Sequence, residues 1–486
     1  MILAWMIIIL MAAGIACWLL HRWNQAIVKW IALAAVSINL VLACMIWSQN
    51  QSGLDRGEWL IQLKQDWIPS FGISFHLAVD GLGAVMLMLT FFLGILSVLC
   101  SWKEIEKRAG FYFFNLLWTL AGITGVFVAM DLFLFYFFWE VMLIPMYFLI
   151  SIWGDTNRRY ASYKFFIFTQ AGGLLMLLSI LALYFIHGQQ TGNYTYNYFE
   201  LLNTNLSSAT ARWIMLGFLI AFAIKLPVVP LHNWLPDAHS EAPTAGSLIL
   251  AGLLLKTGAY GIIRFVMPMF PEAMSAIANW AMILGVFGII YGAMLAFAQT
   301  DLKRLIAYTS VSHMGFVIFG IFAFREMAMQ GVVIQMLAHG ISTGALFVMA
   351  GMLKERLHTR DMLQMGGLWT PMSRMGGFAL VFTMASLGLP ALGNFIAEIL
   401  ILMGAFPVNA TLTILASLGL VFSALYSLRM MQKVFLGQPV TNEMSDLSGR
   451  EVFIMAALTV GIVVLGLFPQ PVMDTVAPLI RQIVSN

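Results

Sequence analysis

Two ionisable side chains of opposite charge lie deep inside apolar stretches, where an isolated charge is costly. Glu140 lies in FLFYFFWEVMLIPMYFLI, nine residues after Asp131 and eighteen before Arg158. Lys225 ends an uncharged run that begins at Trp213. A carboxylate at mid-membrane is expected to be protonated or to find a cation, and Lys225 is the natural partner. The pattern predicts a functional charge pair, with a static pair that fixes helix packing as the alternative.

Lys256 lies near the middle of SLILAGLLLKTGAYGIIRF, with no carboxylate within one helical turn. Burial disfavours the charged amine, so this lysine should exchange a proton more readily than an exposed one. The apolar residues on both sides hinder the amine from reaching the membrane surface. Lys256 is therefore the clearest candidate for a proton carrier.

Two histidines follow in later apolar stretches, His313 in YTSVSHMGFVIFG and His339 in VIQMLAHGISTGALF. Histidine titrates near neutral pH and can donate and accept at once, which suits a proton relay. Each could equally be a packing residue satisfied by neighbouring hydroxyls, which Ser310, Ser312, Ser342 and Thr343 supply. Both histidines are candidate relay residues.

Glu398 is the only acid of the stretch ASLGLPALGNFIAEILIL, residues 385–402. Arg429, in the next apolar stretch, is its nearest basic candidate. We expect Glu398 to hold in the second half of the chain the place that Lys225 holds in the first. A carboxylate there could end a proton path at the outside face.

A cluster of histidines and acids lies in LHNWLPDAHSEAPTAGS, namely His232, Asp237, His239 and Glu241. The residue types resemble metal ligands, but the spacing does not match HExxH. Because prolines lie at 236 and 243, we favour a loop that orders the neighbouring helices over a metal site.

Composition places these residues in a membrane protein. Of 486 residues, 61% are hydrophobic and 10% charged, whereas about a quarter of an average globular sequence is charged. The formal net charge of +3 gives no reason to expect a nucleic-acid partner. Three scattered cysteines make an iron–sulfur or zinc site unlikely, and no GxGxxG fingerprint or P-loop is present.

Apolar runs of about 20 residues between charged or Pro/Gly-rich breaks predict an all-α integral membrane protein with about fourteen transmembrane helices. The expected spans are 2–20, 28–48, 81–101, 111–129, 132–152, 163–187, 212–231, 242–266, 274–298, 305–324, 328–352, 375–404, 410–436 and 451–469. The longest connections are 49–80 and 188–211, and we expect both to be loops.

The distribution of Lys and Arg predicts the orientation. With both termini outside, the outside loops hold five basic residues: Arg56, Lys64, Arg212, Arg325 and Arg481. The inside loops hold sixteen: Arg22, Lys29, Lys103, Lys107, Arg108, Arg158, Arg159, Lys164, Lys303, Arg304, Lys354, Arg356, Arg360, Arg374, Lys433 and Arg450. The set Asp301, Lys303 and Arg304, at the inside end of the ninth span, is as readily an ordinary charged loop as a functional group.

Two spans carry Pro/Gly breaks. The seventh contains AIKLPVVPLHNWLP and the twelfth contains GLPALG. They lie five spans apart and so cross in opposite directions, which predicts two inverted five-helix repeats with discontinuous helices 7 and 12. The expected units are the N-terminal helices 1–110, the first repeat 111–266, the second repeat 274–436, and a last helix with its tail, 451–486. Ordinary enrichment of Pro and Gly in membrane helices is the alternative.

These residues resemble the chain-M (chain 4) family of NADH–quinone oxidoreductase, respiratory complex I. The resemblance covers essentially the whole chain and is carried by PDAHSEAPTAGS, LLLKTGAYG and SVSHMG, together with FFWEVMLIPMYFLISIWG. Sister antiporter-like chains of the same complex share the broader HxW-P pattern.

The resemblance implies a role in proton pumping. In this family the Glu of FWEVMLIPM pairs with the Lys of the broken helix, matching Glu140 and Lys225. The Lys of LLLKTG is the central relay, here Lys256, and the His of LAHG and the Glu after the second break match His339 and Glu398. The family's peripheral arm carries FMN and iron–sulfur clusters and passes electrons from NADH to quinone.

We therefore expect a proton-translocating subunit with no cofactor in this chain, in a bacterial inner membrane. Its expected partners are the other membrane and peripheral subunits of complex I, membrane lipid and protons. Two alternatives remain at this point. One is a subunit of a multi-subunit Na⁺/H⁺ antiporter or membrane-bound hydrogenase, and the other is a passive scaffold whose buried charges only fix its packing.

Overall fold

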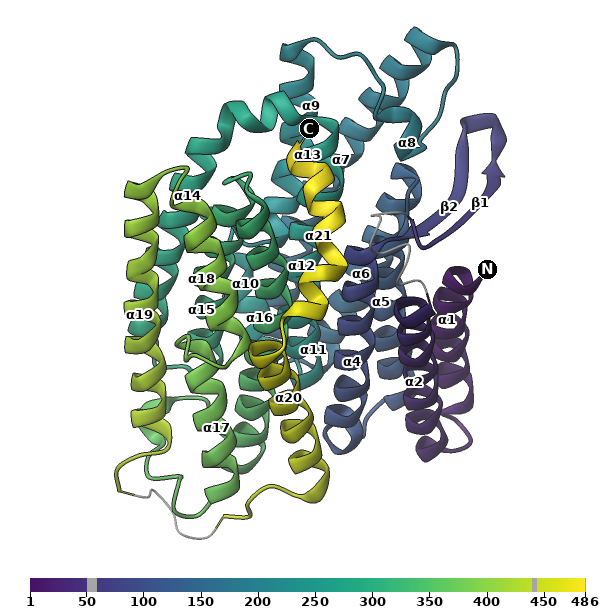
Figure 1. The fold of residues 1–486 in the computed structure, drawn as a ribbon. Helices are drawn as coiled ribbons and strands as arrows, with labels where there is room; N and C mark the ends of the chain where they lie inside the picture. The colour runs from purple at the N-terminus through teal and green to yellow at the C-terminus, as the bar shows by residue number, and fades with distance from the viewer. Residues whose placement is uncertain (50–58, 439–443, 486) are drawn as a thin grey trace.

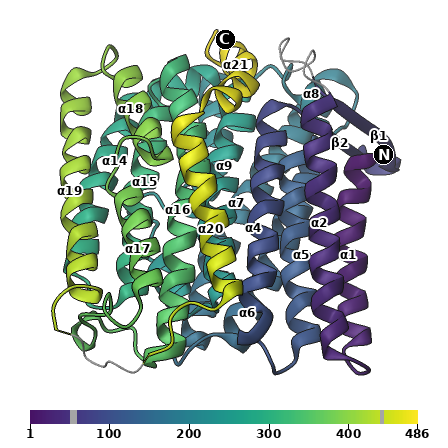
Figure 2. The ribbon, with the colours of Figure 1, turned by 60° about the horizontal axis from the view of Figure 1, so that its bottom comes forward.

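Apolar helices of membrane-spanning length dominate the molecule, a computed structural model that describes residues 1–49, 59–438 and 444–485 (Figures 1 and 2). Within those residues, thirteen helices are long and apolar enough to cross a membrane. Twelve of them are continuous α-helices: α1 (Ile2–Leu20), α2 (Gln25–Gln49), α4 (Gly81–Glu104), α5 (Ala109–Val128), α6 (Leu132–Trp153), α7 (Arg158–Thr191), α9 (Ser208–Lys225), α14 (Pro271–Ala298), α15 (Leu302–Ile321), α16 (Glu326–Leu357), α19 (Ala410–Val434) and α20 (Gly449–Leu467). The chain is a multi-pass membrane protein, as predicted.

Both predicted helix breaks are confirmed. The seventh span stops where α9 ends at Lys225 and resumes as α10 (Trp234–Glu241), after a segment with a cis Val229–Pro230 peptide bond. The twelfth span divides into α17 (Ser373–Ser386) and α18 (Gly393–Ala405). With the divided twelfth span the chain makes fourteen crossings, and Figure 2 shows N and C at the same end of the bundle. The inverted-repeat relation, the unit boundaries and the side on which the termini lie stay predictions.

The eighth span changes helix type around its lysine, which no sequence signal indicated. It runs from Thr244 to Met269 as α11 (Thr244–Ile249), the π-helix η2 (Leu250–Leu254), α12 (Leu255–Gly261), the π-helix η3 (Ile262–Val266) and α13 (Met267–Met269). Segments of π-helix occur mostly at functional sites. Two helical stretches, this span and α16, are buried throughout their most apolar 18 residues, so they form the centre of the bundle.

One predicted loop contains a hairpin. Within 49–80, residues 50–58 lie outside the described part, and β1 (Ile61–Ile68) pairs antiparallel with β2 (Ile73–Val79) through the short helix η1 (Pro69–Phe71). The alternation of apolar and polar residues in IQLKQDWI and ISFHLAV is a strand signal, although only a loop was predicted there. Three further short or terminal helices are α8 (Tyr198–Leu201), η4 (Met362–Gln364) and α21 (Gln470–Ser485).

The hairpin is fastened to the start of α6, the helix that carries Glu140. Asp131 caps α6 by accepting hydrogen bonds from the amides of Phe133 and Leu134, and it also accepts from the amide and hydroxyl of Ser74 in β2. Burial raises the pKa of the Asp131 carboxyl, although these donors oppose the rise. The cap therefore joins the hairpin and the start of a membrane helix.

Candidate functional site

Lys256 and His339 meet at the centre of the bundle. The Lys256 amine lies 2.7 Å from Nδ1 of His339 on α16 and donates to the carbonyl of Ala251 at 2.5 Å. Ala251 belongs to the π-helix η2, five residues before the lysine, so the change of helix type supplies the lysine with a carbonyl acceptor. Both ionisable side chains are fully buried. The predicted proton carrier therefore has a hydrogen-bond partner on a second helix.

His313 and Glu398 form a second pair. Nδ1 of His313 on α15 lies 3.1 Å from Oε1 of Glu398 on α18. Tyr426 on α19 places its hydroxyl 3.3 Å from Nε2 of the same ring, and the amide of Gln335 lies 3.4 Å from Nδ1. Tyr426 and Gln335 are site residues that were not predicted from the sequence, because only residues that are charged or titrate near neutral pH stand out within an apolar run.

The two pairs lie next to each other. The rings of His313 and His339 have centroids 5.7 Å apart and cross at 65°. Ionisable groups thus follow one another from Lys256 through His339 and His313 to Glu398, on four different helical elements. From the sequence, His313 is one of two candidate relay residues, and the geometry sets it between His339 and Glu398.

The free oxygen of Glu398 faces the break in the twelfth span. Oε2 has no hydrogen-bond partner within the described residues, and it would lie 3.1 Å from a Cβ built on Gly388. Gly388 has φ +81°, a left-handed backbone conformation that residues other than glycine rarely adopt. The break therefore places unwound backbone beside a carboxylate oxygen that remains available.

Lys225 lies at the end of α9 between two aromatic rings. Its amine is 5.3 Å from the ring centroids of Trp139 and Phe165, and among the described residues it has no hydrogen-bond partner. The side chain is completely buried. Cation–π attraction compensates for part of the lost hydration, but it leaves the amine's donors unused.

Glu140, the predicted partner of Lys225, is turned toward α7. It accepts a hydrogen bond from Gln170 at 3.4 Å, and a Cβ on Gly173 would come within 3.0 Å of its Oε1. The predicted direct pair is not formed in this structure, although the charge of Lys225 still acts on Glu140 electrostatically. The physical reason is that Glu140 finds a donor on α7 while Lys225 finds aromatic faces.

Lys225 and Lys256 belong to segments in close contact. A Cβ on Gly258 in α12 would lie 2.6 Å from the carbonyl of Phe222 and 2.9 Å from the amide of Leu226, at the end of α9. Only glycine allows this approach of backbone to backbone. A displacement at the broken end of α9 would consequently be felt directly by the helix that carries Lys256.

The expected loop around 232–241 is mostly helix, which corrects the sequence-based interpretation. Asp237, His239 and Glu241 lie on α10, which follows the N-cap residue Asn233. Pro236 does not prevent this helix, because proline is tolerated in the first turn of a helix. Asp237 pairs with Lys164 at 2.6 Å and with Arg304 at 2.7 Å, so its oxygens are occupied by cations. His239 is fully buried and stacks on Phe347 at 4.5 Å.

A polar cavity of about 370 Å³ opens beside α10 at the end of the bundle that holds the predicted inside loops. Its lining includes Glu104, Asp155, Glu241, Lys303 and Lys354. Partial burial opposes ionisation of Asp155, but the ion pair with Lys354 and the charge of Arg360 hold its pKa below the usual value. Lys303, for which an ordinary charged loop and a functional group were equally open, is buried and donates to the carbonyl of Ala242 at 2.8 Å.

Two other intramembrane cations have separate surroundings. Arg264 forms a buried ion pair with Asp80, the N-cap of α4, and its guanidinium lies 4.8 Å from the ring centroid of Trp59. Arg429, predicted as the nearest base to Glu398, instead places its guanidinium 4.3 Å from the ring centroid of Phe297. The partner of Glu398 is His313.

The chain is similar in sequence to known membrane proteins. Residues 129–424 match the family described as NADH:quinone oxidoreductase/Mrp antiporter, transmembrane. The chain is 52% identical over 488 residues to the NADH-quinone oxidoreductase subunit M of Escherichia coli strain K12, covering 98% of this chain and 96% of that protein. The subunit M of Pseudomonas aeruginosa is likewise 52% identical, over 486 residues and with the same shares covered.

Solved structures show the same fold. A chain of respiratory complex I from Thermus thermophilus with bound NADH has a TM-score of 0.90 and 28% identity, covering 100% of this chain and 99% of that one. A chain of the Mrp complex from Dietzia sp. DQ12-45-1b has a TM-score of 0.87 at 20% identity, covering 99% and 97%. The second comparison supports the fold alone.

Proposed function

Since the chain belongs to the NADH:quinone oxidoreductase/Mrp antiporter family, we propose that it is the proton-translocating membrane subunit M of an NADH-quinone oxidoreductase. It couples electron transfer from NADH to quinone, carried out elsewhere in the complex, to proton movement across the membrane. FMN, iron–sulfur clusters and quinone belong to the parent complex. Sister antiporter-like chains and the peripheral subunits are its partners, and the bacterial inner membrane is its location.

Proton entry uses the polar cavity beside α10. The cavity opens at the end of the bundle where the basic loops predict the inside, and its acidic lining can take protons from water. Lys303 and then His239 lie on the way inward, and the charges of Lys303 and Lys256 both act on His239. Water that hydrates the broken seventh span completes this route to Lys256.

The Glu140–Lys225 pair controls the charge state of Lys256. When the two side chains approach each other, their charges cancel and a proton on Lys256 is less costly to bury. When they separate, Lys225 acts as an unpaired like charge that expels the proton. The absence of a hydrogen-bond partner for the Lys225 amine within the described residues supports the existence of such a separated arrangement.

The observation that carries the proposal is the row of buried groups that begins at Lys256. The lysine amine lies 2.7 Å from Nδ1 of His339, and Nδ1 of His313 lies 3.1 Å from Glu398, so only the step between the two rings needs a water or a ring rotation. Glu398 then releases the proton toward the outside through the twelfth-span break, where its free oxygen faces Gly388.

Lys256→Ala tests this function in the complete complex. In inverted membrane vesicles supplied with NADH, acridine-dye quenching reports pumping and quinone reduction reports electron transfer. The variant should lose nearly all proton movement that depends on this chain. Lys103→Ala, an exposed lysine near the end of α4, is the matched control and should behave as wild type. Wild-type pumping by Lys256→Ala would remove the lysine from the path.

The same experiment addresses the passive-scaffold alternative. A scaffold predicts that removing the buried charge reduces the amount of assembled complex, as seen on a blue-native gel stained for NADH oxidation, while pumping per assembled complex stays normal. Sodium-dependent transport without NADH would instead indicate an antiporter subunit. The proposal requires intact assembly together with lost pumping.

A further inference from the structure

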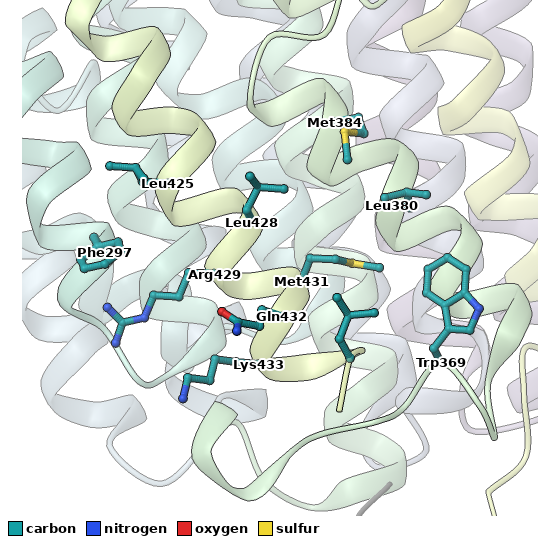
Figure 3. Close-up of a pocket in the computed structure, with 11 residues that line it drawn as sticks. Phe297, Trp369, Leu380, Met384, Leu425, Leu428, Arg429, Met431, Gln432 and Lys433 are labelled. Carbon is teal, nitrogen blue, oxygen red and sulfur yellow. The ribbon is translucent and has the colours of Figure 1, made fainter. Parts of the chain in front are cut away.

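A large groove lies on the membrane-facing side of the bundle, away from the row of ionisable groups. It has a volume of about 1050 Å³ and lies between α17 and α19, beside the last turn of α14 (Figure 3). Its walls include Leu380 and Met384 from α17, and Leu425 and Leu428 from α19. None of the ionisable groups of the proposed proton path lines it.

The chemistry of the groove changes along its length. Leu425 lies about 6 Å deeper along α19 than Arg429, at 1.5 Å per residue, and Lys433 lies about 6 Å farther toward the loops. On α17 the apolar Met384 likewise lies deeper than Leu380. Trp369, just before α17, lies near the same loop end as Lys433, the level at which tryptophan meets lipid headgroups. The groove is apolar in its depth and cationic at its mouth.

The two cations at the mouth have no acidic partner. Within the described residues, neither Arg429 nor Lys433 forms an ion pair or hydrogen bond, and no carboxylate is among the residues that line the groove. Some basic residues of other predicted inside segments do have an acidic partner, among them Lys164, Lys354 and Arg356. The guanidinium of Arg429 is held over Phe297, which fixes its direction while leaving its donors free.

We propose that this groove binds an anionic phospholipid of the inside leaflet, with the phosphate at Arg429 and Lys433 and an acyl chain along the leucines and Met384. Charge complementarity favours this occupant, because two free donors suit a phosphate and an uncharged apolar wall suits an acyl chain. A partner helix would bury both cations and would have to supply acids to both, whereas a phosphodiester meets them with one group.

Photo-crosslinking in the intact complex tests the proposal. The complex is placed in nanodiscs with a trace of phosphatidylglycerol or phosphatidylcholine carrying a diazirine in one acyl chain, and labelled peptides are mapped by mass spectrometry. Phosphatidylglycerol should label residues 380–384 and 425–436 about tenfold more than phosphatidylcholine. Arg429→Gln combined with Lys433→Gln should remove that preference, a loss of about tenfold, which is within reach of two basic side chains.

Two further variants separate charge from shape. Arg429→Lys with Lys433→Arg keeps both charges and should keep most of the labelling. Arg159→Gln removes an exposed basic residue at the start of α7, outside the groove, and should change nothing. Equal labelling by the two lipids, or unchanged labelling after the double Gln substitution, would overturn the proposal. So would the absence of lipid label together with amine crosslinks from Lys433 to another subunit, since a protein would then cover the groove.

Discussion

Two buried ionisable groups beside helix breaks, Lys225 and Glu398, differ in how well they are satisfied. Lys225 lies between aromatic rings with no hydrogen-bond partner in the described part of the chain. Glu398 shares a hydrogen bond with His313, which is held in turn by Tyr426. Both side chains are almost completely buried, so burial alone does not distinguish them.

The difference assigns different tasks to the two halves. An unsatisfied buried amine is a high-energy arrangement that the approach of Glu140 would relieve, as expected of a switch. A carboxylate with a histidine partner has its donor and acceptor already placed, as expected of a proton relay.

Removing the charge of Glu140 should have the largest effect. Glu140→Gln leaves Lys225 without its counter-charge in every state, so pumping should fall about tenfold or more, within the usual range of coupling between sites. Vesicle dye quenching with NADH measures it. Glu106→Gln, an exposed acid in the α4–α5 loop, is the control and should pump normally. Wild-type pumping by Glu140→Gln would show that the first half contains no switch.

Neutralising Glu398 should have a smaller effect. Glu398→Gln retains a hydrogen-bond partner for His313 but cannot take up a proton, so pumping should fall about fivefold, the lower end of such couplings. Assembly on blue-native gels should be unchanged because the network is still hydrogen-bonded. If Glu398→Gln instead lost more pumping than Glu140→Gln, the second half would be the limiting one and the comparison would be reversed.

Removing the Tyr426 hydroxyl should have a mild effect. Tyr426→Phe deletes a 3.3 Å contact to His313 and leaves the ring in place, so pumping should slow about twofold, the equivalent of about 0.5 kcal/mol for a weak hydrogen bond. The initial rate of dye quenching at several pH values is the measurement. The control is Tyr291→Phe, on α14 and absent from the His313 network. No change at any pH would show that the tyrosine only fills space.

Sequence reasoning was most successful where the bilayer imposes strict rules. A span needs a long apolar run, so α4, α5 and α16 were found close to their observed bounds, and Pro/Gly runs marked both broken helices. The π-helices around Lys256 were missed because they depend on packing against neighbouring helices rather than on a local residue type. The hairpin was missed because its strands lie outside the apolar spans that guided the analysis.

The sequence pointed to the residues of the candidate site but not to the contacts among them. Charge and burial alone pointed to Lys256, His339 and Glu398, since few ionisable groups occur inside apolar runs. Which of them touch depends on the rotation of each helix about its axis, and no sequence spacing reports that. Arg429 was accordingly chosen as the base for Glu398, whereas in the structure Tyr426 of the same helix contacts His313 and Arg429 lies over Phe297.

Asp80→Asn should leave pumping per assembled complex unchanged. It adds a third buried charged group to the comparison of Lys225 with Glu398. Asp80 pairs with Arg264 and caps α4 through the amide of Gly83, so both oxygens of its carboxylate are occupied by structural contacts. Breaking it leaves Arg264 buried without its counter-charge, at a cost of about 3–5 kcal/mol, and assembled complex on blue-native gels should decrease sharply. Asp66→Asn, on the exposed side of β1, is the matched control. Reduced pumping in the complexes that do assemble would place Asp80 and Arg264 in the proton path, and would mean that a well-satisfied ion pair can serve transport as an unsatisfied lysine does.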